Sequence, residues 1–256
     1  MTRKIWSRKQ SICRFEIKKD HILPMKIGGF QKSSLIDYPD KICCIIFVSG
    51  CNFHCPYCHN PELINGNYHS TPYSDENLIF EFLEKRKSML DGVVITGGEP
   101  TLYEEIFELC HTIKKIGYPV KIDTNGSRPN VVKKLIEEDL VDYIAMDIKT
   151  TLSNYSPLIQ ENCNPEDLMS SIRLIMDSKK DYEFRTTCVK PLVSLEIIEE
   201  ISIFIMGARL YTLQGFNDTK VLNPDFFQEN EVDYTGEDLE DMLDIAKPWV
   251  RQCLIR

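Results

Sequence analysis

The sequence lacks any long apolar run. Its longest uninterrupted one, 42–48, is seven residues, whereas a membrane-spanning helix needs about 20. Residues 1–24 are basic, but they contain no apolar stretch of the kind found in a secretory signal. We therefore expect no membrane segment and no exported form, and predict a cytoplasmic location.

An excess of positive charge is also missing. The 30 Lys and Arg are outnumbered by 39 Asp and Glu, a formal net charge of −9. Such a balance gives a nucleic-acid partner no electrostatic support. Residues 1–24 are the exception, with seven basic residues against two acids. We predict that they form a basic extension and that 25–256 form one domain, since 256 residues fit a single large α/β unit.

Cysteine is plentiful, with ten residues, but it is not arranged as a disulfide framework or a zinc ribbon. A disulfide-rich protein is usually small and exported, and no second C-x2-C pair follows the first. Cys43 and Cys44 lie in the apolar run 42–48 and are expected to be small buried hydrophobes. The other scattered cysteines are Cys13, Cys110, Cys163, Cys188 and Cys253.

Short apolar runs alternate with longer amphipathic ones along the chain. This pattern predicts parallel strands joined by helices, and six repeats favour a partial (β/α)6 barrel of one domain. Functional residues of such sheets collect where strands end. The predicted strands are Ile42–Val48, Gly92–Thr96, Pro119–Asp123, Asp142–Asp147, Tyr182–Val189 and Arg209–Leu213.

One loop concentrates the chemistry. GCNFHCPYCHNPEL, 50–63, follows the first predicted strand and carries Cys51, Cys55 and Cys58 in a C-x3-C-x2-C spacing. Three thiolates can bind three irons of a [4Fe–4S] cluster and leave the fourth iron open to an outside ligand. Tyr57 offers a ring against which a flat base could pack.

A zinc site completed by His54 or His59 is the competing interpretation. His54 lies inside the ligand loop, where the geometry is cramped, and the spacing matches no zinc pattern. The spacing also differs from the bacterial ferredoxin run C-x2-C-x2-C-x3-C-P. A [4Fe–4S] cluster with one iron open to an outside ligand is the favoured interpretation.

This loop resembles the signature of the radical S-adenosylmethionine (SAM) superfamily. Together with SLIDYPDK at 34–41, it is similar to the activating enzymes of glycyl radical enzymes. Within that group the chain resembles the anaerobic ribonucleoside-triphosphate reductase activating protein type, and also pyruvate formate-lyase activating enzyme. The resemblance runs from about Met25 through the last strand and implies a partial (β/α)6 barrel.

The resemblance implies a [4Fe–4S] cluster and SAM as cofactors. One electron from the cluster would cleave SAM to methionine and a 5′-deoxyadenosyl radical, which would remove hydrogen from a glycine of a partner glycyl radical enzyme. An external ferredoxin or flavodoxin is expected as electron donor, because the chain carries no further ferredoxin-like cysteine cluster.

Three further motifs each follow a predicted strand. TGGEP at 96–100 and DTNGS at 123–127 could be plain turns, and DIK at 147–149 could be a surface ion pair. The resemblance instead places them beside SAM, with Lys149 near its carboxylate. The implied cofactor-binding residues are Tyr57, Cys58, His59, Gly97, Gly98, Glu99, Asp123, Asn125, Asp147, Ile148, Lys149 and Arg185, with a monovalent cation near Asp123 and Asp147.

Arg185 leaves two interpretations open. It lies in the fifth predicted strand and could reach the cofactor, or it could form a structural salt bridge with an acid of the barrel. Gln214, at the end of the sixth predicted strand, is a further candidate for the adenosine pocket. No role is expected for His21, His69 or His111, and His111 is expected at the edge of the core.

Two other functions compete with the activating enzyme. One is a radical SAM enzyme that acts on a small molecule, resembling 7-carboxy-7-deazaguanine synthase. The other is a non-catalytic iron–sulfur or metal-binding module. Formation of 5′-deoxyadenosine from SAM would separate both enzymes from the binding module.

Overall fold

The computed structural model describes residues 25–64, 75–160, 163–216, 220–228 and 233–256. The predicted basic extension, 1–24, therefore lies outside the described residues, as do His21 and His69.

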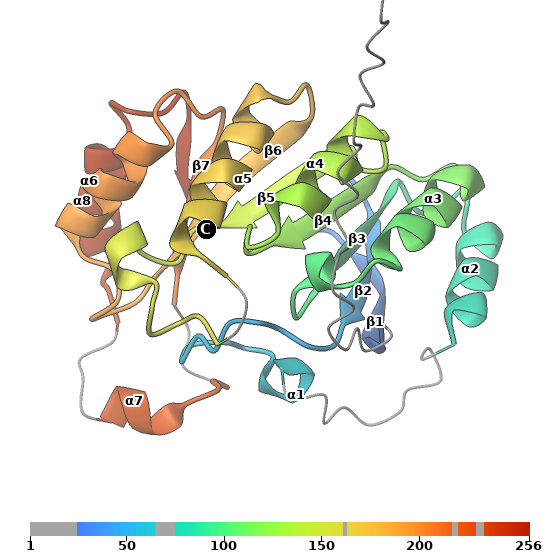
Figure 1. The fold of residues 1–256 in the computed structure, drawn as a ribbon, viewed down its shortest axis with the longest axis horizontal. Helices are drawn as coiled ribbons and strands as arrows, with labels where there is room; N and C mark the ends of the chain where they lie inside the picture. Colours follow the sequence, from blue (N-terminus) through green and yellow to red (C-terminus); the bar gives the residue numbers. More distant parts are fainter. Residues whose placement is uncertain (1–24, 65–74, 161–162, 217–219, 229–232) are drawn as a thin grey trace, which may run out of the picture.

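One sheet of eight strands organises the molecule (Figure 1). The strands are hydrogen-bonded in chain order, β1 to β8. β1 pairs with β2 in antiparallel fashion, and every later pair is parallel. The strands are β1 Ile27–Ser34, β2 Cys43–Val48, β3 Gly92–Gly97, β4 Val120–Thr124, β5 Tyr143–Asp147, β6 Asp181–Cys188, β7 Tyr211–Gly215 and β8 Cys253–Ile255.

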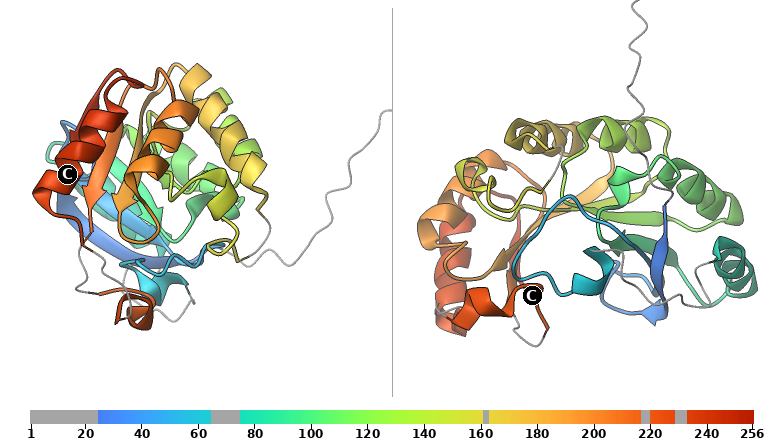
Figure 2. Two further views of the ribbon diagram at one scale, coloured as in Figure 1. Left: turned by 90° about the vertical axis from the view of Figure 1, so that its left-hand side faces the viewer. Right: turned by 60° about the horizontal axis from the view of Figure 1, so that its bottom comes forward.

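Helices cover the outer face of the curved sheet (Figure 2). Within the described residues, the edge strands β1 and β8 pair only with their chain neighbours, so the sheet stays open. This is the predicted partial barrel. The helices are α1 Pro61–Ile64, α2 Glu76–Lys85, α3 Ile106–Ile116, α4 Pro129–Glu137, α5 Pro165–Asp177, α6 Leu195–Phe204, α7 Pro224–Gln228 and α8 Gly236–Ala246, with 3-10 turns η2 Pro100–Leu102 and η3 Leu152–Asn154.

The six predicted strands correspond to β2 through β7, each within two residues at either end. The two edge strands were missed. β1, IGGFQKSS, contains two glycines and a polar second half, and its middle is half-buried or exposed. β8 is only three residues long. Edge strands need less apolar surface than buried ones, so their sequences carry a weaker signal.

Adjacent cysteines of β2 enter two different cores. Cys44 belongs to the main core between sheet and helices. Cys43 faces the inside of the barrel, in a small cluster with Tyr38, Ile45 and Tyr143. Both cysteines are fully buried, which confirms their expected packing role and follows from the two-residue period of a strand.

Helices α5, α6 and α8 begin at side-chain caps. Asn164 and Thr235 form capping boxes at α5 and α8, and Ser194 caps α6. Ser74, which the sequence offers as a candidate cap before α2, lies outside the described residues. In the structure Asp75 caps that helix and accepts from the backbone of Asn77.

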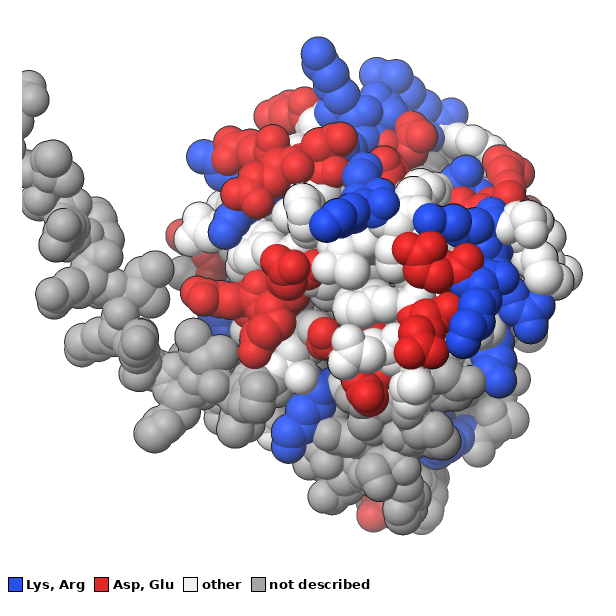
Figure 3. All heavy atoms as spheres, turned by 90° about the vertical axis from the view of Figure 1, so that its right-hand side faces the viewer, with Lys and Arg blue, Asp and Glu red and all other residues white. Residues whose placement is uncertain are grey.

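No described helix has the length and apolar character needed to cross a membrane. On the face that carries α2, acidic and basic side chains are interspersed among uncharged ones (Figure 3). The described residues on that face therefore form no continuous basic surface of the kind that binds nucleic acid.

Candidate functional site

The three-cysteine loop is held in place by backbone hydrogen bonds at both ends. Gly50 N–H donates to the carbonyl of Leu63 at 2.7 Å, which closes the loop onto α1. On the other side, His54 N–H donates to Leu158 O at 2.8 Å, and Gln160 N–H donates to Asn52 O at 2.9 Å. The connection after β5 thus supports the loop that follows β2.

Hydrogen-bond donors point at the first sulfur. The Sγ of Cys51 accepts from Phe53 N–H at 3.4 Å and lies 4.0 Å from the Nδ2 of Asn125. Donors of this kind suit a thiolate, and hydrogen bonds to sulfur are among the features that tune iron–sulfur clusters. Burial raises the pKa of the Cys55 thiol to about 11, so a bound metal would have to displace its proton.

No three His, Cys, Asp or Glu side chains converge on a single metal position within the described ranges. His59 is exposed, with Nδ1 3.0 Å from the carbonyl of Lys220 and its ring stacked on Phe216. This argues against the zinc site. A [4Fe–4S] cluster needs no such convergence, because each cysteine binds a different iron. The three thiolates on one pocket wall therefore fit the cluster.

The two glycines of TGGEP allow this turn to approach the cysteine loop. A Cβ on Gly98 would lie 1.9 Å from the carbonyl oxygen of Gly50, and Gly97 has a φ of +112°. The close approach lets Gly98 N–H donate to Val48 O, and Glu99 N–H donate to Gly50 O, each at 2.8 Å. Neither position accepts a side chain without rearrangement.

Glu99 connects two of the loops. Its carboxylate is buried and accepts from the Thr101 backbone and hydroxyl, from the Thr124 hydroxyl at 2.7 Å and from Asn125 N–H at 2.6 Å. Burial raises the pKa of Glu99, although these donors oppose the shift. Both oxygens thus already have protein partners, and the visible role of Glu99 is to hold the loops after β3 and β4 together.

Five charged side chains from β4, β6, β5 and the connection after β5 form an alternating series, which we call the charge cluster: Lys121, Asp123, Arg185, Asp147 and Lys149. Asp123 contacts Lys121 Nζ at 2.5 Å and an Arg185 terminal nitrogen at 3.4 Å. Asp147 contacts Arg185 Nε at 2.7 Å and Lys149 Nζ at 3.0 Å. Arg185 therefore forms the salt bridge that was one of its two expected roles.

The charge cluster keeps its acids ionised. Burial alone would raise the pKa of Asp123 and of Asp147, but Arg185, together with Lys121 or Lys149, holds both pKa values below the ordinary range. Burial would likewise lower the pKa of Lys149, yet Asp147 raises it well above its usual value. The two aspartates, Lys149 and Arg185 are therefore charged at neutral pH.

Lys149 also connects to the cysteine loop. Its backbone N–H donates to the Tyr155 hydroxyl at 2.7 Å, and the Tyr155 ring packs edge-on against Phe53. Its Nζ lies 5.9 Å from the centre of the Tyr57 ring, which is itself buried. The Tyr57 hydroxyl and the Nδ1 of His54 are buried without a hydrogen-bond partner in the described part of the chain.

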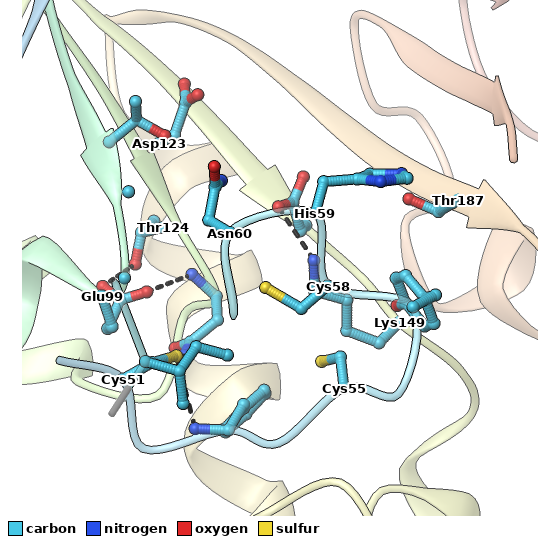
Figure 4. A pocket seen from close by; sticks show the side chains of 18 residues that line it. Cys51, Cys55, Cys58, His59, Asn60, Glu99, Asp123, Thr124, Lys149 and Thr187 are labelled. Atoms are coloured by element: carbon cyan, nitrogen blue, oxygen red, sulfur yellow. Dashed lines mark hydrogen bonds and ion pairs between the residues drawn. The ribbon is translucent and has the colours of Figure 1, made fainter. Parts of the chain in front are cut away.

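One pocket brings the motifs together (Figure 4). The three cysteines line it with Glu99 and Thr124 on one side and Lys149 on the other. The predicted site residues that line the pocket are Cys51, Cys55, Tyr57, Cys58, His59, Gly97, Gly98, Glu99, Asp123, Asn125, Asp147 and Lys149. The wall also includes four residues that lie within the predicted motifs, Phe53, Asn60, Thr96 and Thr124. Ile64 and Thr187 line it from outside those motifs.

The remaining predicted residues lie off the pocket wall. Ile148 is buried, and its backbone donates to Arg185 O. Arg185 contacts Asp123 and Asp147 but does not line the pocket. Gln214 lies within β7 rather than after it. His111 is on the exposed face of α3 rather than at the core edge. Thr187 could have been found from its place near the end of β6, next to Cys188.

Comparisons with known proteins concern the family and the fold of the chain. Residues 45–205 match the family model described as the Radical SAM superfamily. Over 240 residues the chain is 33% identical to a protein of Methanocaldococcus jannaschii that bears the provisional name glycyl-radical enzyme activating enzyme, and the match covers 90% of this chain and 95% of that protein. It is 31% identical, over 131 residues, to the 7-carboxy-7-deazaguanine synthase of Haemophilus influenzae, covering 50% of this chain and 51% of that enzyme.

Among solved structures, SuiB of Streptococcus suis bound to the precursor peptide SuiA superposes with a TM-score of 0.62 at 16% identity. The match covers 83% of this chain and 48% of SuiB, so the chain spans about half the length of that protein. At this identity the likeness concerns the fold alone.

Proposed function

The chain belongs to the radical SAM superfamily, and on that premise we propose that it is a glycyl-radical-enzyme activating enzyme. It would cleave SAM reductively and abstract hydrogen from a glycine of a partner protein, of the anaerobic ribonucleotide reductase kind. The observation that carries this proposal is the meeting of three thiols, a glycine turn and a charge cluster at one pocket.

In this proposal Cys51, Cys55 and Cys58 hold the cluster. When bound, the reduced cluster and SAM together supply the 5′-deoxyadenosyl radical, which is chemistry of the cofactors and not of the protein. The protein supplies position and electrostatics. Asn125 and the Phe53 backbone donate toward the Cys51 sulfur, which favours its thiolate form.

The SAM carboxylate would meet Lys149. This lysine ends the charge cluster on the pocket wall and is 14% exposed. Its ammonium is partly shielded from water, so a carboxylate there gains more than it would at the surface. The backbone of Gly97 and Gly98 would contact the amino group of the methionine part, with Glu99 holding that turn in place.

A protein substrate is supported by the openness of the sheet. The described edge strands do not close on each other, and the relative from Methanocaldococcus jannaschii extends along nearly the whole chain. A loop carrying the target glycine would have to come within near-attack distance, about 3–3.5 Å, of the radical carbon. The electron would come from an external ferredoxin or flavodoxin.

Electron paramagnetic resonance tests this function. Reduced, cluster-loaded protein would be mixed with SAM and a candidate glycyl radical enzyme from the same organism. We expect a doublet from a glycyl radical that disappears when the partner's target glycine is replaced by alanine. A doublet that persists in the alanine variant would contradict the proposal.

The second candidate is a radical SAM enzyme of the 7-carboxy-7-deazaguanine synthase kind. The 31% identity over half of the chain favours it, but that match covers a smaller share of the chain than the match to the activating-enzyme relative. Turnover of a purine or other metabolite without any protein partner would support this candidate. No metabolite turnover together with a partner-dependent doublet would exclude it.

A further inference from the structure

We propose that the charge cluster contains its own cations, so that SAM binding needs no monovalent metal ion, and that Lys121 is the positioning residue responsible. This inference rests on the proposed function, because it concerns how the same pocket receives the carboxylate of SAM. It replaces the sequence-based expectation that a monovalent cation lies between Asp123 and Asp147.

Each of the four carboxylate oxygens in the cluster already faces a protein cation. Asp123 Oδ1 contacts Lys121 and its Oδ2 contacts Arg185. Asp147 Oδ1 contacts Arg185 and its Oδ2 contacts Lys149. Two adjacent carboxylates need a cation between them, and the Arg185 guanidinium has that place, bridging β4 and β5 from β6.

Lys121 makes this arrangement possible from within β4. It stands two residues before Asp123, so both side chains point to the same face of the strand. The Lys121 side chain is 1% exposed, and its Nζ lies 5.9 Å from the centre of the Tyr143 ring. A lysine so deeply buried needs a permanent counter-ion, and Asp123 at 2.5 Å provides it.

The count of charges explains why a further cation is unfavourable. Lys121, Arg185 and Lys149 contribute three positive charges, and the two aspartates contribute two negative ones. Glu183, another buried acid of β6, is paired with Arg256 at 2.9 Å and does not change this count. The charge cluster therefore has a net charge of +1, which repels a metal cation. One carboxylate, that of SAM, neutralises this charge.

Without Lys121 the balance would change. The cluster would become neutral, and Asp123 Oδ1 would lose its partner and face the space left by the lysine side chain. An uncompensated, buried carboxylate attracts a cation. A variant lacking this charge should therefore acquire the dependence on monovalent cations that the natural chain does not have.

Equilibrium dialysis of labelled SAM against the cluster-loaded full chain tests the proposal. Binding is measured at one ionic strength in potassium, sodium, ammonium or tetramethylammonium chloride. The tetramethylammonium ion is too large to enter the charge cluster. The natural chain should bind with affinities within about twofold in all four salts. Lys121→Met should bind about tenfold more weakly in tetramethylammonium and recover most of that loss in potassium or ammonium.

Two controls keep the result interpretable. Lys121→Arg restores a charge and should remain independent of the salt. Lys114→Met removes a lysine that pairs with Asp142 at 2.7 Å, away from the pocket, and should behave like the natural chain. A natural chain whose SAM affinity rises several-fold with potassium overturns the proposal, and so does a folded Lys121→Met chain without salt dependence.

Thermal unfolding of the full chain loaded with its iron–sulfur cluster, without SAM and in the same four salts, separates this inference from the proposed function. Potassium should raise the Tm of Lys121→Met relative to tetramethylammonium, and should leave the natural chain unchanged. This result does not require SAM. If potassium raises the Tm of Lys121→Met alone but the natural chain binds no SAM, only the proposed function is contradicted. If potassium changes the Tm of the natural chain and of Lys121→Met equally, the proposal that the charge cluster contains its own cations is contradicted.

Discussion

The Cα of Gly98 lies so close to the carbonyl oxygen of Gly50 that an added Cβ would stand 1.9 Å from it. This contact joins the turn after β3 to the residue before the first cysteine. Gly98→Ala should therefore displace the cysteine loop, lower the iron content after reconstitution and destabilise the fold by about 1–3 kcal/mol. Iron analysis and urea unfolding measure both effects.

Gly236→Ala is the matched control for that substitution. A Cβ at Gly236 would meet nothing within 4 Å, and the position is the first residue of α8. We expect full iron content and an unfolding free energy within about 0.5 kcal/mol of the natural chain. Equal losses in the two variants would show that the Gly50 contact is unimportant.

The assignment of Cys51, Cys55 and Cys58 as ligands predicts that bound iron depends on these three of the ten cysteines and not on the others. Anaerobic reconstitution should give about four irons per chain, and Cys55→Ala should remove most of them. Cys110→Ala, in the buried face of α3, should retain the iron at some cost in stability. The reverse pattern of iron content would disprove the assignment of the cluster ligands.

Lys149 is expected to act on SAM and not on the cluster. Lys149→Ala should retain the visible absorbance of the cluster and bind SAM at least tenfold more weakly, because it removes the cation at the pocket end of the charge cluster. Lys247→Ala, an exposed lysine of the C-terminal part, provides the control. If Lys149→Ala binds SAM with unchanged affinity, the ion pair between Lys149 and Asp147 has only a structural role.

The lowered pKa of Asp147 predicts that the free energy of unfolding depends on pH. Its pKa lies well below the ordinary value in the folded chain, so the stabilisation it provides is present above its unfolded pKa, about 3.9, and is lost as the pH falls through its folded pKa. Asp147→Asn should cost about 3–5 kcal/mol at pH 7, and this difference should shrink below about pH 4.

Urea unfolding of the natural and Asp147→Asn chains between pH 3 and pH 7 measures this difference. Asp244→Asn, whose side chain is 73% exposed and paired with Lys247, should show little effect at any pH. A difference between the natural chain and Asp147→Asn that grows toward pH 3 would have the wrong sign for an acid with a lowered pKa.

The basic residues 1–24 are predicted to be dispensable for chemistry. A chain beginning at Met25 should cleave SAM at the natural rate when supplied with a chemical reductant. Met25 N–H already donates to a carboxylate oxygen of Glu105 at 3.3 Å, so its new terminal ammonium would keep a favourable partner. A folded, cluster-loaded short chain that leaves SAM intact would reveal a role for these residues.

Much of the fold could be predicted from local patterns alone. The strands β2, β3 and β5 are short, mostly apolar runs, as expected of strands that are covered on both faces. In β4 and β6, apolar residues alternate with charged or polar ones, which is typical of strands with one polar face. β1 was hidden for the opposite reason: an edge strand with two glycines and exposed polar residues has no distinctive period. Helix starts could be read from Asn164 and Ser194, since capping depends on neighbours a few residues away.

The sequence by itself determined which motifs meet at the pocket, because the cysteine loop and the three later motifs each follow a predicted strand and parallel strands bring their carboxyl ends together. Only the tertiary structure decided how their charges are paired. Lys121 gave no signal in a linear sequence, and Arg185 lies 38 residues after Asp147 and 62 after Asp123. Pairing of buried charges depends on which strands are neighbours and which faces point inward, and these relationships exist only in the folded sheet.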